Sequence, residues 1–349
     1  MAFISFQPKD HFNTKLWSGN SSTQAITGVG FQPDFFWGKN RSSTNNHQVL
    51  DSIRGANNIL ISSSNAQAVA DSNILNSFDS DGYTLGNQDQ LNDTGQTYVG
   101  WSFKGGGTAS SNSNGSITSS VSVNTTAGCS IVQYTGTGSG GATVGHGLSA
   151  APYMIIQKAK TGVTDDWLIY HKSITATNGL ALNNTTAATD SDSYFNDVEP
   201  TSTVFTIGNN GKVNTNGATH MAYCFTPITG YSAMGTYRGN GDADGTFVFT
   251  NHKPAFVMIK CTSQTGDWLI YDSKRSGYNG DNRLIYPNLS NAEEAGSAMP
   301  MDILSNGFKL RTTGNLVNGT SGGAGRSYIY WSVAEEPLVA STGDPATAR

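Results

Sequence analysis

The chain has 349 residues, more than one ordinary hydrophobic core needs and enough for two or three domains. Only 13% of the residues are charged, the net charge is −5 and no basic block occurs, so nucleic acid is not expected as a partner, because phosphate binding needs clustered Lys and Arg. The 15 Phe, 14 Tyr and 6 Trp argue against disorder, because disordered chains are poor in aromatic residues. The composition predicts a folded, loop-rich β protein with an uncharged polar surface.

The first eleven residues are interpreted as a lead-in strand or docking segment. Residues 1–8 contain no cationic stretch followed by a long apolar one, so we do not expect a secretory signal peptide here. No apolar run in the chain approaches the ~18–20 residues of a membrane span. Membrane insertion is therefore not expected either.

Two identical stretches, Asp-Trp-Leu-Ile-Tyr, stand at residues 166–170 and 267–271. Such an echo is the signature of a tandem repeat. Around both copies, and once more near the N-terminus, a proline precedes a lysine by six residues and an aromatic-x-Gly step lies upstream. These landmarks are Pro33 and Lys39, Pro152 and Lys158, Pro254 and Lys260, with Trp17 and Gly19, Tyr134 and Gly136, Tyr237 and Gly239. They predict three copies of one unit.

The landmarks divide the chain into six parts. These are a lead-in segment at residues 1–11, repeat one at 12–105, a flexible linker at 106–116, repeat two at 117–230, repeat three at 231–337 and a tail at 338–349. The linker assignment rests on three consecutive glycines followed by a low-complexity polar run. Repeats two and three join with almost no linker, so we expect these two to pack together and repeat one to be freer.

Each repeat ends in a strand whose large apolar residues occupy every second position, as Val99, Trp101 and Phe103 do in repeat one. This alternation predicts a core face. The runs after the prolines and the Asp-Trp-Leu-Ile-Tyr stretches are continuously apolar and suit central strands covered on both faces. Repeat one has His47-Gln48-Val49-Leu50 where the other two have Trp-Leu-Ile-Tyr, so its packing there must differ.

Convincing helical patterns are scarce, and residues 66–78 are the stretch that could carry a short helix. Turn residues separate many short apolar runs. Many short strands with turn signals, in units of about a hundred residues, are typical of β-sandwiches. We therefore predict an all-β chain of three tandem β-sandwich repeats, of jelly-roll or lectin-like form.

The strongest enzymatic lead is a set of adjacent carboxylates at residues 165–166, 293–294 and 335–336, since glycoside hydrolysis uses two acids. Adjacent acids point apart on a strand, however, and none of these lies in a distinctive motif. We interpret them as surface charges and turn caps. His171 aligns with Asp51 and Asp272, which is not the behaviour of an invariant catalytic base. No enzyme and no catalytic residue is predicted.

Cofactor and metal sites are not expected either. The acidic turns at residues 79–82 and 242–245 resemble the start of a calcium loop but lack the spaced acidic ligands that follow in one. The three cysteines, Cys129, Cys224 and Cys261, form no CxxC pair. A bridge between Cys129 and Cys224 is geometrically conceivable, but reduced and partly buried thiols are the favoured interpretation.

Several phrases resemble a β-rich repeat family of tailed bacteriophages that is common in marine phages. They are ITGVGFQPDFFWGKN (26–40), DSIRGANN (51–58), SFDSDGYTLG (77–86), GHGLSAAPYMIIQKA (145–159), DILSNGFKLRTTG (302–314) and the closing YIYWSVAEEP (328–337). The resemblance covers nearly the whole chain and implies a virion structural or fibre protein. It implies no catalytic residues, and it places the protein on the particle surface after synthesis in the host cytoplasm.

Two functions follow as hypotheses. The first is a fibre or tail-tip protein that binds host-surface glycans through loops between constant strands, as a homo-oligomer, with a trimer favoured, so that weak sites add up. Its candidate contacts are Tyr237, Arg238, Asp272, Lys274, Arg275 and Tyr278. The second is an architectural protein that decorates the head or braces the tail and binds only other virion proteins.

Overall fold

The computed structural model describes residues 6–275, 278–280, 282–295 and 299–337, and it is all-β with a few short helices. We refer to residues 12–105, 117–230 and 231–337 as segments 1, 2 and 3. The first five residues and the predicted tail at 338–349 lie outside the described part of the chain.

Segment 1 contains a four-stranded antiparallel sheet with the order β1-β9-β3-β4 and a three-stranded sheet with the order β2-β8-β7. The elements are β1 (Phe12–Ser18), β2 (Gln24–Ile26), β3 (Phe35–Asn40), β4 (Gln48–Asp51), β5 (Asn58–Ile59), β6 (Val69–Ala70), β7 (Leu75–Asp79), β8 (Gly82–Leu85), α1 (Asp89–Asn92) and β9 (Thr97–Phe103). The helix expected within residues 66–78 is wrong, because β6 and β7 occupy that stretch.

Segment 2 is built on an eight-stranded sheet with the order β10-β11-β12-β19-β14-β15-β16-β17, and a β13-β18 pair forms its second sheet. The elements are β10 (Ser110–Asn112), β11 (Ser119–Asn124), β12 (Cys129–Thr135), β13 (Ala142–Gly145), β14 (Met154–Ala159), β15 (Leu168–His171), η2 (Lys172–Ile174), β16 (Asn178–Ala181), β17 (Thr189–Asp190), α2 (Asp192–Phe195), β18 (Val204–Ile207), α3 (Gly211–Asn214) and β19 (Thr219–Phe225).

Segment 3 has a five-stranded sheet with the order β20-β29-β22-β23-β24 and a three-stranded sheet with the order β21-β26-β25. The elements are β20 (Ser232–Arg238), β21 (Phe247–Phe249), β22 (His252–Cys261), β23 (Trp268–Asp272), β24 (Leu284–Ile285), β25 (Met301–Leu304), β26 (Gly307–Leu310), β27 (Thr320–Ser321), β28 (Ala324–Gly325) and β29 (Ser327–Pro337).

One strand order recurs in all three main sheets. The last strand lies beside the strand that follows the proline, and that strand beside the next one along the chain. On its other side the last strand pairs with the first strand in segments 1 and 3 and with β12 in segment 2, where β11 and β10 extend the sheet further. The post-proline strands and the Leu-Ile-Tyr strands are buried throughout, as predicted for central strands. Pro254 lies within β22 at an irregularity in the pairing, a place where a residue without an N–H is tolerated.

The alternating residues of the last strands are buried, which confirms the predicted core face. They do not lie inside the separate segments, however, but in one apolar cluster to which all three segments contribute. At its centre Phe103, Phe225 and Trp331 meet, with ring centroids 5.2 Å apart for Phe103 and Trp331 and 4.5 Å apart for Phe225 and Trp331. The main sheets therefore turn one face toward the other segments and the opposite face toward their own smaller sheet.

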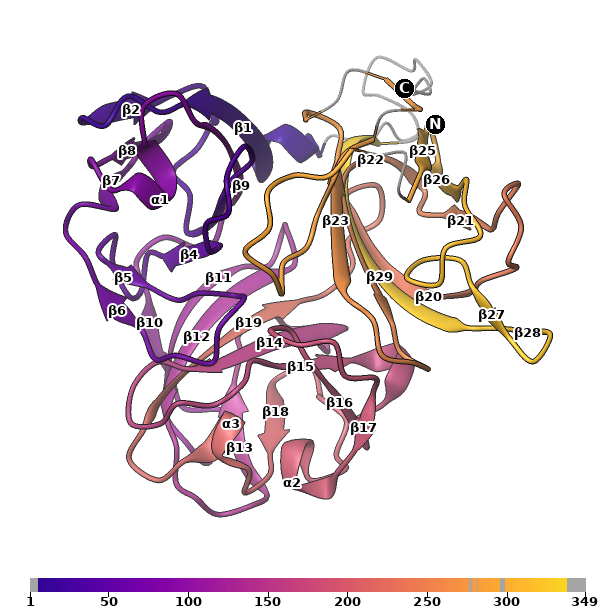
Figure 1. Cartoon of the computed structure of the whole chain (residues 1–349). Coiled ribbons are helices and arrows are strands. Elements are labelled where there is room, and N and C mark those ends of the chain that lie inside the picture. The colour runs from indigo at the N-terminus through magenta and orange to yellow at the C-terminus, as the bar shows by residue number, and fades with distance from the viewer. Residues whose placement is uncertain (1–5, 276–277, 281, 296–298, 338–349) are drawn as a thin grey trace.

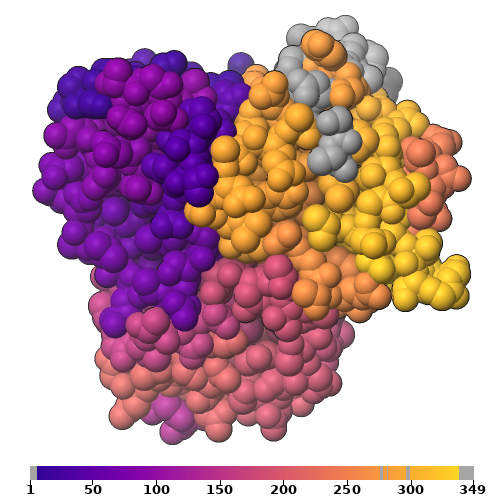
Figure 2. Space-filling model, in the orientation of Figure 1, coloured from indigo at the N-terminus to yellow at the C-terminus, as the bar shows by residue number. Residues whose placement is uncertain are grey.

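The three segments lie beside one another in the ribbon view (Figure 1), and the space-filling view shows them in contact along their boundaries (Figure 2). The common apolar cluster joins them. The expectation that repeat one would be freer is therefore wrong. Its residues supply a large part of the common cluster, including Phe35 and Trp37.

The glycines expected to form a flexible linker are tied to both neighbouring segments. The Gly106 N–H donates to Ser122 Oγ at 3.0 Å, and the Gly107 N–H donates to Asp34 Oδ2 at 3.3 Å. Farther along the predicted linker, β10 pairs with β11. The crossing from segment 1 to segment 2 is thus a hydrogen-bonded part of the fold.

The described part of the lead-in segment is a short 3-10 helix, η1 (Pro8–Asp10), and not the expected strand. Phe6 stacks on His11 at 4.5 Å between centroids and touches Tyr231 of segment 3 at 4.9 Å. These contacts attach the lead-in segment to the start of segment 3.

The three cysteines are free thiols, as favoured from the sequence, and all three are buried. Burial raises the pKa of the Cys129 thiol to about 12, so it is unreactive at neutral pH. Within the described ranges, no helix is long and apolar enough to cross a membrane.

Candidate functional site

Tyr237 is a structural residue. It is 7% exposed, and its hydroxyl donates to the Val317 carbonyl at 2.7 Å. The aromatic residues of the same step in the other segments make the same bond: Trp17 Nε1 donates to the Leu91 carbonyl at 2.8 Å, and the Tyr134 hydroxyl donates to the Val213 carbonyl at 2.7 Å. The sequence held the signal for this role, because Tyr237 belongs to a column that all three repeats share.

Asp272 and Arg275 form a fully buried ion pair, with 2.5 Å between Arg275 Nε and Asp272 Oδ2. Burial alone would raise the pKa of the Asp272 carboxyl, but the neighbouring Arg275 guanidinium and the N–H donors of the turn lower it on balance. Trp101 of segment 1 donates its indole N–H to the same carboxylate oxygen at 3.0 Å. The pair therefore bonds to a neighbouring segment and is closed to a ligand from solvent.

Segment 1 contains the matching arrangement. Asp51 and Arg54 are buried with 2.5 Å between the carboxylate oxygen and Arg54 Nε, and the Tyr223 hydroxyl of segment 2 donates to Asp51 at 2.7 Å. In segment 2 the equivalent position is His171, whose pKa is lowered to about 4 by burial. The Asp, His and Asp of this column all lie at contacts between segments.

The other three predicted contacts are more accessible but do not gather. Tyr278 is 69% exposed, and Lys274 forms an ion pair with Glu335 at 3.2 Å. Arg238 pairs with Ser327 at one end of the main sheet of segment 3, whereas Lys274 follows the other end of that sheet. The structure therefore does not bring the six predicted residues together into one site.

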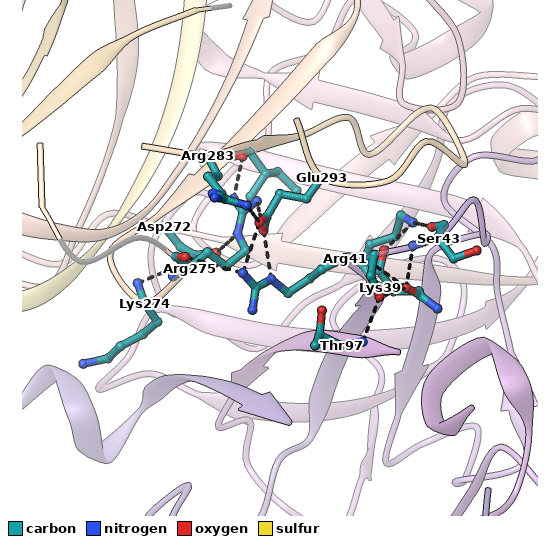
Figure 3. A network of polar contacts seen from close by, with 12 residues as sticks. Lys39, Arg41, Ser43, Thr97, Asp272, Lys274, Arg275, Arg283 and Glu293 are labelled. Carbon is teal, nitrogen blue, oxygen red and sulfur yellow. Dashed lines mark hydrogen bonds and ion pairs between the residues drawn. The ribbon is translucent and has the colours of Figure 1, made fainter. Parts of the chain in front are cut away.

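A buried carboxylate, Glu293, holds segments 1 and 3 together (Figure 3). Arg41 of segment 1 contacts it through two nitrogens, at 2.9 and 3.0 Å. Arg275 and Arg283 of segment 3 contact the same carboxylate at 3.3 and 3.2 Å. The side chain of Glu293 is 4% exposed, so three guanidinium groups balance one desolvated charge.

The other adjacent acids are also engaged in structural contacts. Glu294 accepts a hydrogen bond from the Tyr286 hydroxyl at 2.8 Å, and Glu335 pairs with Lys253 and Lys274. Asp244, in one of the turns compared with calcium loops, contacts Lys309 at 2.7 Å, and this bond is the main cause of its lowered pKa. No group of three or more potential metal ligands occurs in the described part of the chain.

The lysines that follow the prolines close three equivalent contacts. Each is buried and donates its Nζ to a backbone carbonyl of another segment: Lys39 to Ser290 at 3.2 Å, Lys158 to Asn65 at 3.0 Å and Lys260 to Thr185 at 3.0 Å. Burial lowers the pKa of each of these ammonium groups to about 8. The contacts run from segment 1 to 3, from 3 to 2 and from 2 to 1, so they form a closed ring.

Ring nitrogens reinforce the same three contacts. Trp167 Nε1 donates to the Ile61 carbonyl at 2.9 Å, and Trp268 Nε1 donates to the Ala181 carbonyl at 2.9 Å. In segment 1 the matching position is His47, whose Nε2 lies 3.1 Å from the Tyr286 carbonyl. In segment 1, His47 therefore makes the contact with the next segment that Trp167 and Trp268 make in segments 2 and 3. This is how the packing differs where the sequence of repeat one departs from that of the other two.

A backbone bond completes each contact. The N–H of Ala68 donates to Lys160 at 3.0 Å, that of Ala188 to Thr262 at 3.0 Å and that of Glu293 to Arg41 at 2.8 Å. The landmarks found in the sequence therefore position the interfaces between the segments. Sequence reasoning recognised the columns but could not tell that their polar atoms reach a neighbouring copy.

Hollows with polar walls occur at several places on the described surface. A groove of 660 Å³ lies where segments 1 and 2 meet, beside residues 104–107 and 123–126, and another of 420 Å³ lies beside the lead-in segment and the end of β29. A smaller cavity of 140 Å³ lies within segment 2, among β15, β16, α2 and α3. This last cavity places Asp166, Lys212, Asn184 and Tyr194 around one small space, whereas the two larger grooves spread similar side chains over larger volumes.

No curated protein and no solved structure matches the chain. A family model described as a domain of unknown function, DUF7483, matches residues 7–337, which include all three segments. The chain therefore belongs to the DUF7483 family.

Proposed function

We propose that the protein is a structural component of a tailed bacteriophage particle, acting as a rigid body that other virion proteins hold. The observation that carries this proposal is the single apolar core shared by all three segments and closed by three equivalent polar contacts. A body whose three described segments are tied to one another suits a protein that has to survive outside the cell. The assignment to a phage particle rests on the stretches of sequence that resemble the phage repeat family.

We also propose that the segments are three tandem β-sandwich repeats. The recurring strand order supports this, as does the apolar cluster between the two sheets of each segment. The matched bonds of Trp17, Tyr134 and Tyr237 support it further, because they tie equivalent strands to equivalent turns.

The three contacts already form a closed ring within one chain. This arrangement favours a single chain, and not an oligomer, at each position on the particle. A homotrimer of single repeats would use the surfaces that these segments already use on one another. One chain thus presents three similar copies around a common centre, which suits a threefold-symmetric partner such as the end of a trimeric fibre. The homotrimer expected from the sequence is the competing arrangement.

Glycan recognition is not assigned to the loops of segment 3. Of the six residues that supported it, Tyr237, Asp272 and Arg275 are buried structural contacts. The architectural function therefore takes precedence over the recognition function, in reverse of the order that the sequence favoured.

The test is to purify phage particles that encode this chain, identify their proteins by mass spectrometry and locate the chain by antibody-gold labelling. We expect stoichiometric amounts in washed particles and labels at defined positions. Particles that contain none of this protein would overturn the proposal. Light scattering of the purified chain then decides between the monomer that we propose and a trimer.

A further inference from the structure

Both apolar and polar residues line the cavity of segment 2. Leu168 and Leu180 supply apolar carbon surface, and Thr186 and Thr189 lie at an exposed rim. Four polar or aromatic residues also line the cavity. Asp166 precedes β15, Asn184 follows β16, Tyr194 lies in α2 and Lys212 lies in α3. β16, α2 and α3, which supply part of its lining, lie in the lower part of the molecule in Figure 1.

One glycine, Gly179, lets two of the lining side chains pack directly against the backbone of β16. A Cβ at Gly179 would come within 2.8 Å of Leu168 Cδ1 and of Tyr194 Cδ2, so a larger residue there would need both neighbours to move. The cavity measures 140 Å³. An engineered protein cavity of about 150 Å³ accommodates benzene, so this one has room for the ring atoms of one six-membered ring, and the substituents of a sugar would extend to the rim formed by Thr186 and Thr189.

The polar groups converge on the carboxylate of Asp166. Lys212 Nζ lies 3.1 Å from Asp166 Oδ2, and the Asn184 side-chain amide donates to the same oxygen at 3.4 Å. The other oxygen, Oδ1, accepts from the Asn183 side-chain amide at 2.7 Å, a bond that Asp267 and Asn288 repeat in segment 3. The Lys212 ammonium also lies 5.7 Å from the centre of the Tyr194 ring. The acid and the base cancel in charge, which favours a neutral ligand, and together they offer both donors and acceptors to hydroxyl groups.

In segment 3 the equivalent place is filled by apolar side chains. Where segment 2 has Gly179, Ala181, Asn184 and Lys212, the equivalent positions of segment 3 are Leu284, Tyr286, Leu289 and Leu316. All four of these residues belong to the apolar cluster of segment 3 or pack against it. The same fold therefore closes this space with apolar side chains in one copy and keeps it open with polar walls in another.

From these observations we propose that the cavity of segment 2 binds one neutral sugar ring. Asp166 and Asn184 contact its hydroxyl groups, Lys212 donates to a further oxygen, and the Tyr194 ring and the two leucines cover a C–H face. A ring without hydroxyl groups would leave Asp166 and Lys212 desolvated and unpaired with the ligand, which is unfavourable. This site is independent of the virion assignment and lies in a different segment from the loops that the sequence favoured.

The test is a titration of the isotope-labelled full chain with glucose, galactose, mannose and fucose, followed by amide NMR spectra. Each sugar is taken to about 50 mM, well above the millimolar dissociation constant expected of a small, solvent-rimmed site. We expect saturable shifts for at least one sugar, confined to the amides of Gly179, Asn184, Tyr194 and Lys212. Absence of saturable shifts with all four sugars would overturn the proposal, as would shifts centred elsewhere on the protein.

The matched variant is Asn184→Leu with Lys212→Leu, which gives segment 2 the residues that segment 3 has at both positions and should therefore fold. We expect its affinity for the sugar to fall at least about tenfold, equivalent to about 1.4 kcal/mol. Lys172→Leu, an exposed lysine of the same segment outside the cavity, is the control and should bind as the parent chain does. Equal affinity of all three proteins would contradict the site.

Discussion

The contact of segment 1 with segment 3 and that of segment 3 with segment 2 reach equivalent carbonyls with different side chains. His47 lies 3.1 Å from the Tyr286 carbonyl, and Trp268 donates to the Ala181 carbonyl at 2.9 Å. The smaller ring of His47 is accompanied by Trp37, which donates its indole N–H to His47 Nδ1 at 2.9 Å. The post-proline strand of segment 3 has a methionine, Met258, at the position of Trp37. The indole is thus supplied by Trp37 in segment 1 and by Trp268 in segment 3, and the side-chain contact with the carbonyl is present in both.

The same two contacts also differ in charge. Arg41 and Glu293 face each other between segments 1 and 3, whereas the equivalent pair between segments 3 and 2 is Thr262 and Ala188. Both pairs keep the backbone hydrogen bond. The geometry of the ring is therefore set by backbone and ring nitrogens, and the ionic network is an addition at one contact. The predictions below test each part of this difference.

The largest effect is expected at the centre, which all three contacts share. Trp331→Ala removes a buried ring that touches Phe103, Phe225 and Phe256 of all three segments. We expect the free energy of unfolding to fall by about 3–5 kcal/mol, measured by urea denaturation. Phe249→Ala, at a side chain that is 55% exposed, is the control and should change it little. A loss of stability restricted to segment 3 would contradict a shared core.

The ionic contact ranks next. Glu293→Gln leaves Arg41, Arg275 and Arg283 without their common counter-charge in a buried setting. Removing one partner of a buried ion pair is strongly destabilising, and we expect a loss of about 3 kcal/mol. Glu294→Gln is the matched control, since that residue accepts a single bond from a tyrosine hydroxyl. Equal urea midpoints for the two variants would show that the network adds nothing to this contact.

Replacing the imidazole ring of His47, at the contact between segments 1 and 3, should lower the free energy of unfolding by a smaller amount. His47→Trp places a second indole beside Trp37, and we expect overpacking to lower stability by about 1–3 kcal/mol. Adding Trp37→Ile, which copies the isoleucine found in segment 2, should recover most of that loss. A double-mutant cycle measures this coupling. Additive effects of the two changes would contradict the exchange of bulk between the two positions.

The smallest effect expected is a change in acid sensitivity. Burial lowers the pKa of His220 to about 4, so the unfolded chain binds a proton below pH 6.5 that the folded chain does not. Stability contributed by this group is present above about pH 6.5 and falls as the pH falls toward 4. Tyr98 and Tyr328 occupy the equivalent positions of the other segments. His220→Tyr should therefore flatten the loss of stability between pH 6.5 and 5.5 by about 1 kcal/mol. Parallel pH profiles would contradict this.

Much of the strand layout could be predicted from the sequence. The columns around Pro33, Pro152 and Pro254 and the alternation after Val99 identify the strands and the core face, because periodicity reports which side chains are buried. Periodicity does not report against what they are buried. The sequence therefore did not show that the three segments share one core. The glycines at 105–107 were interpreted as a linker, although Gly106 and Gly107 donate hydrogen bonds to Ser122 and Asp34.

The candidate site was harder to predict, for a related reason. Charged and aromatic residues near loops were taken as accessible, yet Tyr237, Asp272 and Arg275 belong to columns that recur in other copies and serve the fold. The cavity of segment 2 depends on positions where copies differ, such as Lys212 against Leu316. Differences between repeats are thus the better guide to a ligand site in this chain, and likenesses are the guide to its architecture.

The central claim is that three segments form one cooperative body. Differential scanning calorimetry of the full chain tests it most directly, by comparing the calorimetric enthalpy of unfolding with the van 't Hoff enthalpy. A shared core predicts one transition in which the two enthalpies agree, and it predicts that Trp331→Ala shifts the whole of that transition. A separate melting transition for segment 1, left in place by Trp331→Ala, would contradict the account.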